Sequence, residues 1–490
     1  PGNTSFKTNK ILRHSLPPDT YFWSVQTVDS GYAQSDWSQE QILNIQQFVS
    51  SDQRIRALKE AAMDWGDYDS DGDLDLLLTG EDTFENRAAM LYQNESGRLT
   101  LIGRFPDVSK SAADWGDYDN DGDLDLVLIG QSDDVLDGRQ QSYSRIFQND
   151  GLGGFDQADQ ELVGLNNGEA LWGDYDNDGD LDLVATGSST AGTRELRVYI
   201  NEQAQLADAL LDLPGLESSD LAWGDYDGDG DLDLAAGGIS DTGLRTDLYV
   251  NGGNGAFAPL ADGNFTGIQG GDLAWGDYDN DRDLDLAVAG NNGVMAILQV
   301  YENTLNRSGA AATFEQDQIF LLQGLDFSAI ALVDIDADGD LDLISSGSTG
   351  GFDPIPLSIV NDNLTGQFNR NLVPETPLPQ AAVDAGSDVV LSWLESSDDG
   401  DDTPLSLSYN LRVGTTAEGH DVLSGNVALG LGNAGQRLQH RLQGLLSGTY
   451  FWSVQSIDDG FARSGWSNPQ SFIIDTIAPT VSSFTLSRSQ

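Results

Sequence analysis

The chain has 490 residues, with 80 Asp and Glu against 23 Lys and Arg for a formal net charge of -57, and it contains no Cys. This length predicts two to four domains, and a surface this acidic would repel nucleic-acid phosphates and anionic lipids. The lack of Cys excludes disulfides and thiol catalysis, and no apolar run is long enough to span a bilayer. The carboxylates therefore call for cations, either bound metal ions or the counterions of a salty medium.

The first predicted element is half of a repeated module. Residues 20–26 read Thr-Tyr-Phe-Trp-Ser-Val-Gln, and the same seven residues recur at 449–455. A unit that is cut at the front of the chain and complete near its end implies an array of modules. We therefore expect 1–46 to be the C-terminal part of one β-sandwich module, and we expect 476–490 to begin a further module of a longer multidomain chain.

A second repeat fills the region between these copies. The nine-residue pattern Asp-x-Asp-x-Asp-Gly-Asp-Leu-Asp occurs six times, and in five copies the dipeptide Trp-Gly stands immediately before it. The sixth copy has Leu332-Val333 in place of Trp-Gly, and the fifth has Arg282 in place of Gly. The copies begin at Asp67, Asp117, Asp174, Asp225, Asp277 and Asp334.

Short apolar segments around each loop predict strands rather than helices. After the loop comes a buried strand, as at 74–79, 124–129 and 181–186, and a fourth strand is expected at 155–162 and 314–322. The third strand ends in an Asn, at Asn94, Asn149, Asn201, Asn251, Asn303 and Asn361. We expect these Asn residues to cap the backbone rather than to bind a ligand.

Four antiparallel strands in each repeat predict the blades of a β-propeller over residues 47–375. A β-solenoid has shorter repeats, and a string of small calcium-loop modules would lack the apolar strands. Six loops predict six blades. A seven-bladed propeller is the alternative, because Phe48–Leu58 also resembles a fourth strand and could close the ring beside Gln367–Val373.

Five carboxylates within nine residues repel one another unless a cation neutralises them. Positions 1, 3, 5 and 9 can supply side-chain oxygens and position 7 a backbone carbonyl, which is the oxygen set that Ca²⁺ prefers. An EF-hand is rejected because position 12 is never Glu, and Mg²⁺ rarely takes an all-protein cage. The alternative, acidic turns that only solubilise the surface, does not predict fixed positions.

The candidate metal ligands are accordingly thirty aspartates, five in each loop, and they would hold up to six Ca²⁺ ions. They are Asp67, Asp69, Asp71, Asp73 and Asp75; Asp117, Asp119, Asp121, Asp123 and Asp125; Asp174, Asp176, Asp178, Asp180 and Asp182; Asp225, Asp227, Asp229, Asp231 and Asp233; Asp277, Asp279, Asp281, Asp283 and Asp285; and Asp334, Asp336, Asp338, Asp340 and Asp342. At the fifth loop, Arg282 predicts a distorted, weaker or empty site, because Arg resists a positive φ and adds a positive charge.

The motif Trp-Gly-Asp-Tyr-Asp-x-Asp-Gly-Asp-Leu-Asp-Leu resembles the FG-GAP/VCBS repeat family, whose members include the integrin α-chain propellers. The resemblance covers about residues 48–375 and implies a calcium-binding propeller with its metal loops on one face. Residues 376–475 resemble a fibronectin type III domain, and Tyr450 stands where such sandwiches place a corner tyrosine. Alternation of such modules resembles large surface or secreted proteins of bacteria.

Nothing in the sequence predicts catalysis. The chain has only three His residues, His14, His420 and His440, and it lacks nucleophile-elbow, zinc-protease and phosphate-loop motifs. The Trp before each loop could stack on sugars, but its fixed place favours packing between blades.

We therefore expect a calcium-stabilised extracellular or cell-surface scaffold that binds protein or glycan through insertions such as 132–141 and 305–312. No nucleic-acid partner and no membrane insertion are expected. The alternatives are a passive spacer in a surface stalk and an accessory domain of a larger secreted enzyme. The sequence leaves the ligand open.

Overall fold

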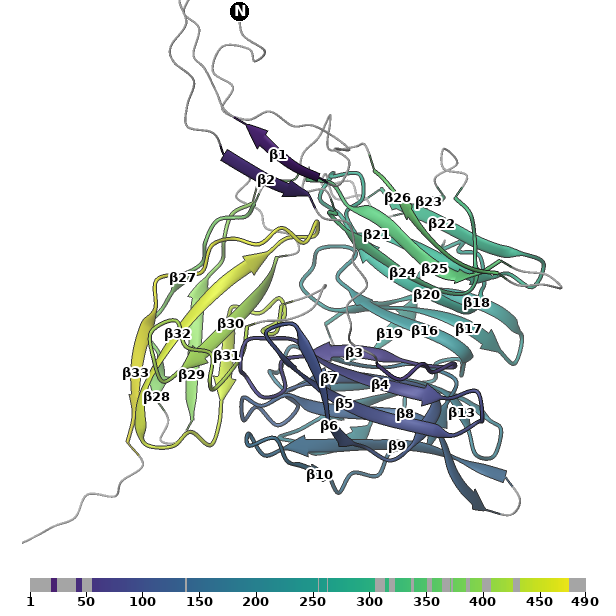
Figure 1. The fold of residues 1–490 in the computed structure, drawn as a ribbon, viewed down its shortest axis with the longest axis horizontal. Coiled ribbons are helices and arrows are strands. Elements are labelled where there is room, and N and C mark those ends of the chain that lie inside the picture. The colour runs from purple at the N-terminus through teal and green to yellow at the C-terminus, as the bar shows by residue number, and fades with distance from the viewer. Residues whose placement is uncertain are drawn as a thin grey trace, which may run out of the picture. The chain divides into compact units, whose positions relative to one another are not determined.

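The computed structural model describes residues 19–23, 41–45, 55–136, 139–253, 255–261, 263–304, 313–316, 322–335, 339–349, 355–363, 371, 373–384, 388–398, 407–425 and 432–475. These residues form strands and turns, without a helix among them, and two compact units divide the chain at Pro1–Arg56 and Ala57–Gln490 (Figure 1). Over the described ranges, no helix has the length and apolar character needed to cross a membrane.

In the first unit, β1 (Asp19–Trp23) pairs antiparallel with β2 (Gln41–Ile45). Asp19 lies opposite Ile45, and in the C-terminal copy of this sequence Gly448 lies opposite Ile474. The two strand pairs therefore share one register, which confirms the structural relation that the repeated sequence predicts. The remaining residues of 1–46, including His14, lie outside the described residues.

Six successive antiparallel repeat units follow. The first comprises β3 (Met63–Gly66), β4 (Asp75–Glu81), β5 (Arg87–Glu95) and β6 (Arg98–Arg104); the second comprises β7 (Val108–Gly116), β8 (Asp125–Leu136), β9 (Arg139–Asn149) and β10 (Phe155–Gln157). The third comprises β12 (Ala170–Gly173), β13 (Asp182–Ser189), β14 (Arg194–Asn201) and β15 (Leu206–Asp208), and β11 (Leu165–Asn166) joins it to the second.

The later units repeat this order. The fourth comprises β16 (Glu217–Gly224), β17 (Asp233–Ser240), β18 (Gly243–Asn251) and β19 (Phe257–Pro259), and the fifth comprises β20 (Gln269–Gly276), β21 (Asp285–Asn291), β22 (Ala296–Asn303) and β23 (Phe314–Gln316). The sixth has three described strands, β24 (Asp326–Val333), β25 (Asp342–Ser348) and β26 (Pro356–Asn361). The result is an all-β, propeller-like repeat fold.

The second strand of every unit begins at the last Asp of its loop, and in the first five units it is buried along most of its length, as its continuous apolar sequence predicts. The expected fourth strands are shorter than predicted. β10 ends at Gln157 and not at residue 162, because after Ala158 bonds to Ile146 the chain leaves the sheet. β23 ends at Gln316, and 317–321 lie outside the described residues.

The Trp before the second, third, fourth and fifth loops packs between consecutive units. The Trp172 ring stacks on Tyr118 of the preceding loop at 5.6 Å between centroids, and a Cβ on Gly116 would lie 2.7 Å from the same indole. Trp115, Trp223 and Trp275 cover the preceding unit's Gly in the same way. These contacts confirm packing between units, and they explain why Gly follows Trp in the repeat.

The Asn at the end of the third strand ties neighbouring units together. The Nδ2 of Asn201 donates to the carbonyls of Leu181 in its own unit and Tyr118 in the preceding one, at 2.9 and 2.7 Å. Asn149, Asn251 and Asn303 repeat the arrangement, which confirms the predicted backbone-capping role. In the sixth unit the third strand ends at Asn361 as predicted, and its side chain donates to the Leu343 carbonyl at 3.2 Å, while Asn363, two residues later, makes the bridge to Tyr278 of the preceding unit.

The junction between the sixth and first units is built differently in the described part of the chain. Val333 stands where a Gly would receive the next Trp, and Trp65 is 39% exposed. The side-chain amide of Asn94 donates to the carbonyl of Leu74 in its own unit. Of the strand predicted at 48–58, residues 55–58 form no strand and 48–54 lie outside the described residues, as do 367–370 and 372.

Two further sheets form a C-terminal β-sandwich at 378–474. One contains β27 (Leu378–Pro379), β28 (Val383–Asp384), β29 (Val389–Leu394) and β31 (Gln439–Leu442), and the other contains β30 (Ser408–Gly414), β32 (Gly448–Ile457) and β33 (Gln470–Ile474). Their shared core contains Trp393, Tyr409 and Trp452. The Tyr450 hydroxyl donates to the Leu446 carbonyl at 2.8 Å, as expected for a corner tyrosine.

Candidate metal centres

The first Asp of each loop folds the loop around its own carboxylate. In the second loop, Asp117 accepts the backbone N–H of Asp121 with Oδ1 and that of Gly122 with Oδ2, both at 3.0 Å. Asn120 has φ 59° and Gly122 has φ 102°, so the turn uses the left-handed region at two positions. The first, fourth and fifth loops repeat these two hydrogen bonds, so the loops share a backbone shape.

The last Asp of the loop fixes it to the sheet. Asp182 is fully buried and accepts the N–H of Asn201 with Oδ1 and of Tyr175 with Oδ2, at 2.8 and 3.2 Å. Asp125, Asp233 and Asp285 make the equivalent pair of bonds. This position therefore has a structural task in addition to its predicted role as a ligand.

Within five loops, three aspartates bring carboxylate oxygens within 4.8 Å of one another. The groups are Asp67, Asp69 and Asp71; Asp117, Asp119 and Asp125; Asp174, Asp176 and Asp182; Asp225, Asp227 and Asp229; and Asp277, Asp279 and Asp285. In the sixth loop Asp336 and Asp338 lie outside the described residues, while Asp334 and Asp342 hold the same turn and sheet bonds.

Several carboxylate oxygens at these clusters are buried and accept no hydrogen bond within the described structure. They are Asp69 Oδ1, Asp75 Oδ2 and Asp227 Oδ1. A buried oxygen that lacks a donor costs free energy unless a cation or water satisfies it. The donor set thus fits a hard divalent cation, and the clusters could hold metal ions.

In the third and fourth loops the side chain at position 7 bonds to the neighbouring loop. Asp180 accepts the side-chain amide of Asn120 at 2.7 Å with one oxygen and the N–H of Gln203 at 2.8 Å with the other. Asp231 accepts the amide of Asn177 at 2.7 Å. These bonds link adjacent loops and leave the backbone carbonyl as the group that position 7 can offer an ion.

The electrostatics of the loops oppose ionisation. Burial, followed by repulsion from neighbouring aspartates, raises the pKa of Asp125 to about 10. Burial also raises the pKa of Asp182 to about 9 and that of Asp233 to about 8, against hydrogen bonds that lower it. A divalent ion among these groups would favour their charged forms and so remove this cost.

The fifth loop keeps the common shape in spite of Arg282. This residue adopts φ 76°, a conformation typical of Gly, and its N–H donates to Asp277 Oδ2 at 2.9 Å as the Gly of other loops does. Asp277, Asp279 and Asp285 remain grouped. The loop is therefore not distorted in backbone shape, and weaker binding at this site remains a prediction.

The structure also reveals a set of acidic residues that the sequence reasoning missed. Each of them accepts a backbone N–H from the first strand of the next unit, at 2.7–3.1 Å. They are Asp64, Asp114, Asp220 and Asp272. Burial raises the pKa of Asp114 to about 7 and that of Glu169, which has Asp114 and Asp272 as neighbours, to about 8. The signal was present as an acidic residue one or three positions before each Trp-Gly.

Comparison with known proteins agrees with this geometry. The FG-GAP-like repeat family matches residues 67–128, 174–236, 225–288 and 277–345. The chain carries FG-GAP-like repeats. All six acidic loops lie inside the matched ranges. Each match begins at one acidic loop, includes the next acidic loop, and ends in the strand that follows that second loop. No curated protein matches the chain.

Solved structures resemble this chain only distantly. One is the extracellular domain of a protein described as a hybrid two component system from B. thetaiotaomicron, with 9% identity, a TM-score of 0.32 and coverage of 84% of this chain and 54% of that one. The chain thus spans about half of that domain. Another is a fructofuranosidase from Schwanniomyces occidentalis, with 9% identity, a TM-score of 0.29 and coverage of 82% and 86%.

Proposed function

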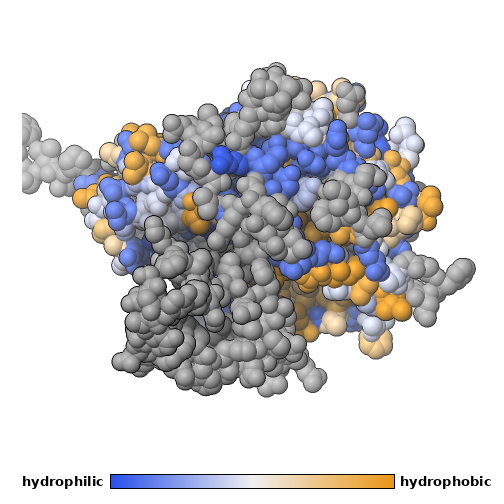
Figure 2. All heavy atoms as spheres, turned by 90° about the horizontal axis from the view of Figure 1, so that it is seen from above, coloured by the Kyte–Doolittle hydropathy of each residue, from blue (hydrophilic) through white to orange (hydrophobic). Residues whose placement is uncertain are grey.

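We propose that the acidic loops bind Ca²⁺ and that the ions are folding cofactors of an extracellular binding or adhesion scaffold. The observation that carries this proposal is the grouping of three carboxylates within 4.8 Å in every completely described loop. Ca²⁺ accepts such crowded oxygen sets, whereas Mg²⁺ usually keeps several waters. The net charge of -57 and the hydrophilic residues in the broad central band of Figure 2 suit an ion-rich medium outside the cell.

We further propose that the six units are the blades of a propeller and that residues 376–475 form a fibronectin type III-like domain. Five consecutive pairs of units share the Asn bridge and four of them share the packing of Trp over Gly, which supports the first assignment. The corner tyrosine and the two-sheet core support the second. The different junction between the sixth and first units keeps seven blades as the alternative.

A protein or glycan ligand would be contacted by the extended hairpin of β8 and β9, the longest pair of strands in the repeat units. Its tip falls in the insertion at 132–141, and Arg87 of the first unit pairs with Asp133 at its base. The second predicted insertion, 305–312, lies outside the described residues. No catalytic role is proposed for the chain.

Two measurements test this function. Thermal unfolding should show a melting temperature that falls when a chelator removes calcium, because each site filled at ten times its dissociation constant adds about 1.4 kcal/mol to the free energy of unfolding. A screen of glycans and surface proteins in calcium should yield a ligand that is lost when 133–140 is replaced by a short turn. Absence of any ligand would favour the passive spacer.

A further inference from the structure

The C-terminal β-sandwich lies over the metal loops. His420 Nδ1 is 3.1 Å from the carbonyl oxygen of Ser70 in the first loop, and the N–H of Gln443 donates to the carbonyl of Asn120 in the second at 2.9 Å. The N–H of Asp277 in the fifth loop donates to the carbonyl of Asp459 at 3.3 Å. We call the surface formed by the six loops the loop face.

These contacts are made to loop residues that hold left-handed backbone conformations. Ser70 and Asn120, whose carbonyls are bound, are both position 4 and have φ 55° and 59°. A Cβ on Gly122 would lie 2.3 Å from the carbonyl oxygen of Val422, and one on Gly72 would lie 2.9 Å from the His420 ring. The sandwich therefore contacts the turn that a bound cation would hold in place.

Side chains of the sandwich also reach the first aspartate of three loops. The Ser424 hydroxyl donates to Asp67, and Arg437 forms an ion pair with Asp174 in which Nε and Oδ2 are 2.8 Å apart. Gln436 Nε2 lies 3.4 Å from Asp225 Oδ2. These donors help to orient carboxylates that belong to the metal clusters.

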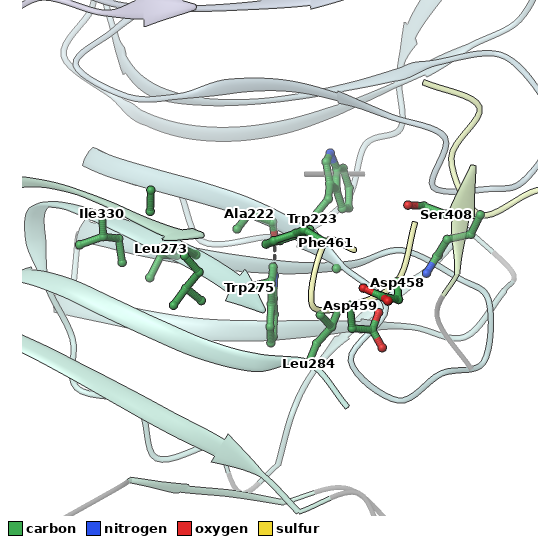
Figure 3. Close-up of a pocket in the computed structure, with 15 residues that line it drawn as sticks. Ala222, Trp223, Leu273, Trp275, Leu284, Ile330, Ser408, Asp458, Asp459 and Phe461 are labelled. Atoms are coloured by element: carbon green, nitrogen blue, oxygen red, sulfur yellow. Dashed lines mark hydrogen bonds between the residues drawn. The ribbon is translucent and has the colours of Figure 1, made fainter. Parts of the chain in front are cut away.

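An apolar contact anchors the centre of this interface. Phe461, in the turn between β32 and β33, packs against an apolar cluster of the fifth and sixth units that includes Leu332 and Leu341. Figure 3 shows it near Trp223 and Trp275, in a cavity of about 320 Å³ that Asp458 and Asp459 also line. Docking thus brings two carboxylates and one guanidinium, that of Arg437, to loops that are already crowded with negative charge, and a cation in the loops would offset the repulsion that remains.

We infer that the loop face is the docking surface of the chain's own sandwich, and that docking and cation binding stabilise each other. Both require the same loop conformation, and the cation lowers the repulsion that docking creates, so each raises the affinity for the other. The inference rests on the proposed binding of calcium. An outside ligand is then excluded from the loop face and must bind elsewhere, as at the β8–β9 hairpin.

The absence of Cys allows two introduced cysteines to carry spin labels in the full chain. Leu152→Cys in the second unit and Leu446→Cys in the sandwich replace side chains that are 91% and 78% exposed. In calcium the distance distribution should be one narrow peak, and in chelator it should broaden to longer distances. A pair at Leu152→Cys and Leu210→Cys, both within the repeat units, should stay narrow.

Two glycine variants supply a matched test. Gly122→Ala and Gly230→Ala both place Ala at position 6, with φ 102° and 91°, so they share the backbone strain. Only the first meets the sandwich, since nothing lies within 4 Å of a Cβ on Gly230. In calcium, Gly122→Ala should broaden the distribution between domains and Gly230→Ala should leave it narrow.

The outcomes separate this inference from calcium binding itself. If equilibrium dialysis shows bound calcium but the distance between domains is unchanged in chelator, the coupling is wrong and the proposed function survives. If no calcium binds, the proposed function fails and the coupling falls with it. Equal distance distributions for Gly122→Ala and Gly230→Ala would contradict the inference that the sandwich docks on the loop face. If the control pair also broadens in chelator, the chelator disturbs the repeat units themselves, and the comparison of the two glycine variants in calcium then tests the inference.

Discussion

At the scale of single residues, variants of Arg282 show whether the backbone strain or the positive charge of this residue weakens calcium binding by the fifth loop. Arg282→Gly should raise the free energy of unfolding by about 0.5–1 kcal/mol, because Gly adopts φ 76° without a Cβ clash. It should also tighten calcium binding at that loop by removing a positive charge. Denaturant unfolding without calcium checks the first effect, and calorimetric titration with calcium checks the second. Arg282→Lys keeps the charge and should change neither, and equal affinity in all three proteins would contradict the argument.

Glu169 predicts a pH dependence of stability. Its folded pKa of about 8 lies above the ordinary value of 4.5 through burial and through Asp114 and Asp272, so folding favours the protonated form. The stabilisation that this proton provides is complete below about pH 4.5 and is lost as the pH rises through about 8. The free energy of unfolding of Glu169→Gln should therefore be about 1–3 kcal/mol higher than that of the wild type at pH 8.5, and the two should be equal at pH 4. Urea unfolding at several pH values measures the difference in free energy of unfolding between the two proteins. A difference that stays constant from pH 4 to pH 8.5 would contradict the raised pKa of Glu169.

At the scale of elements, the Asn bridge between units distinguishes two positions of the same motif. Asn201 is fully buried and satisfies carbonyls in two units, whereas Asn94 reaches one carbonyl in its own unit. Asn201→Ala should cost about 2–3 kcal/mol, because it leaves buried carbonyls unpaired, and Asn94→Ala about 1 kcal/mol. Denaturant midpoints of the two variants measure this difference. Equal losses would show that the bridge adds nothing between units.

The strands and loops of this fold were predictable because the repeat states them six times. A short apolar segment that follows each loop and is closed by Gly predicts a strand, and β4, β8 and β13 begin within one residue of the predicted positions. The bridge of the sixth unit was not predicted, because Asn363, which makes it, lies two residues beyond the Asn361 that ends the strand. The sequence did not predict the role of the acidic residues that bond to the first strand of the next unit, such as Asp64 and Asp114. Their partners lie about 50–60 residues away, so no local pattern marks them.

At the scale of the whole molecule, the sequence predicts the two kinds of module but not their packing. Contacts such as Arg437 with Asp174 join residues far apart in the chain, and no periodicity marks them. The structure adds the reason that the loop face is charged yet covered. The loops there carry a density of negative charge that the described basic residues do not match, so the stability of the repeat units should depend on bound cations.

The calcium content of the folded chain tests this account most directly. After equilibrium dialysis against millimolar calcium and measurement by elemental analysis, we expect five to six ions per chain. The number is six if the fifth loop, which contains Arg282, binds an ion, and five if it does not. Dialysis against magnesium at the same concentration should leave most sites without a tightly held ion. Less than one calcium ion per folded chain would contradict the central claim that divalent ions hold the acidic loops together.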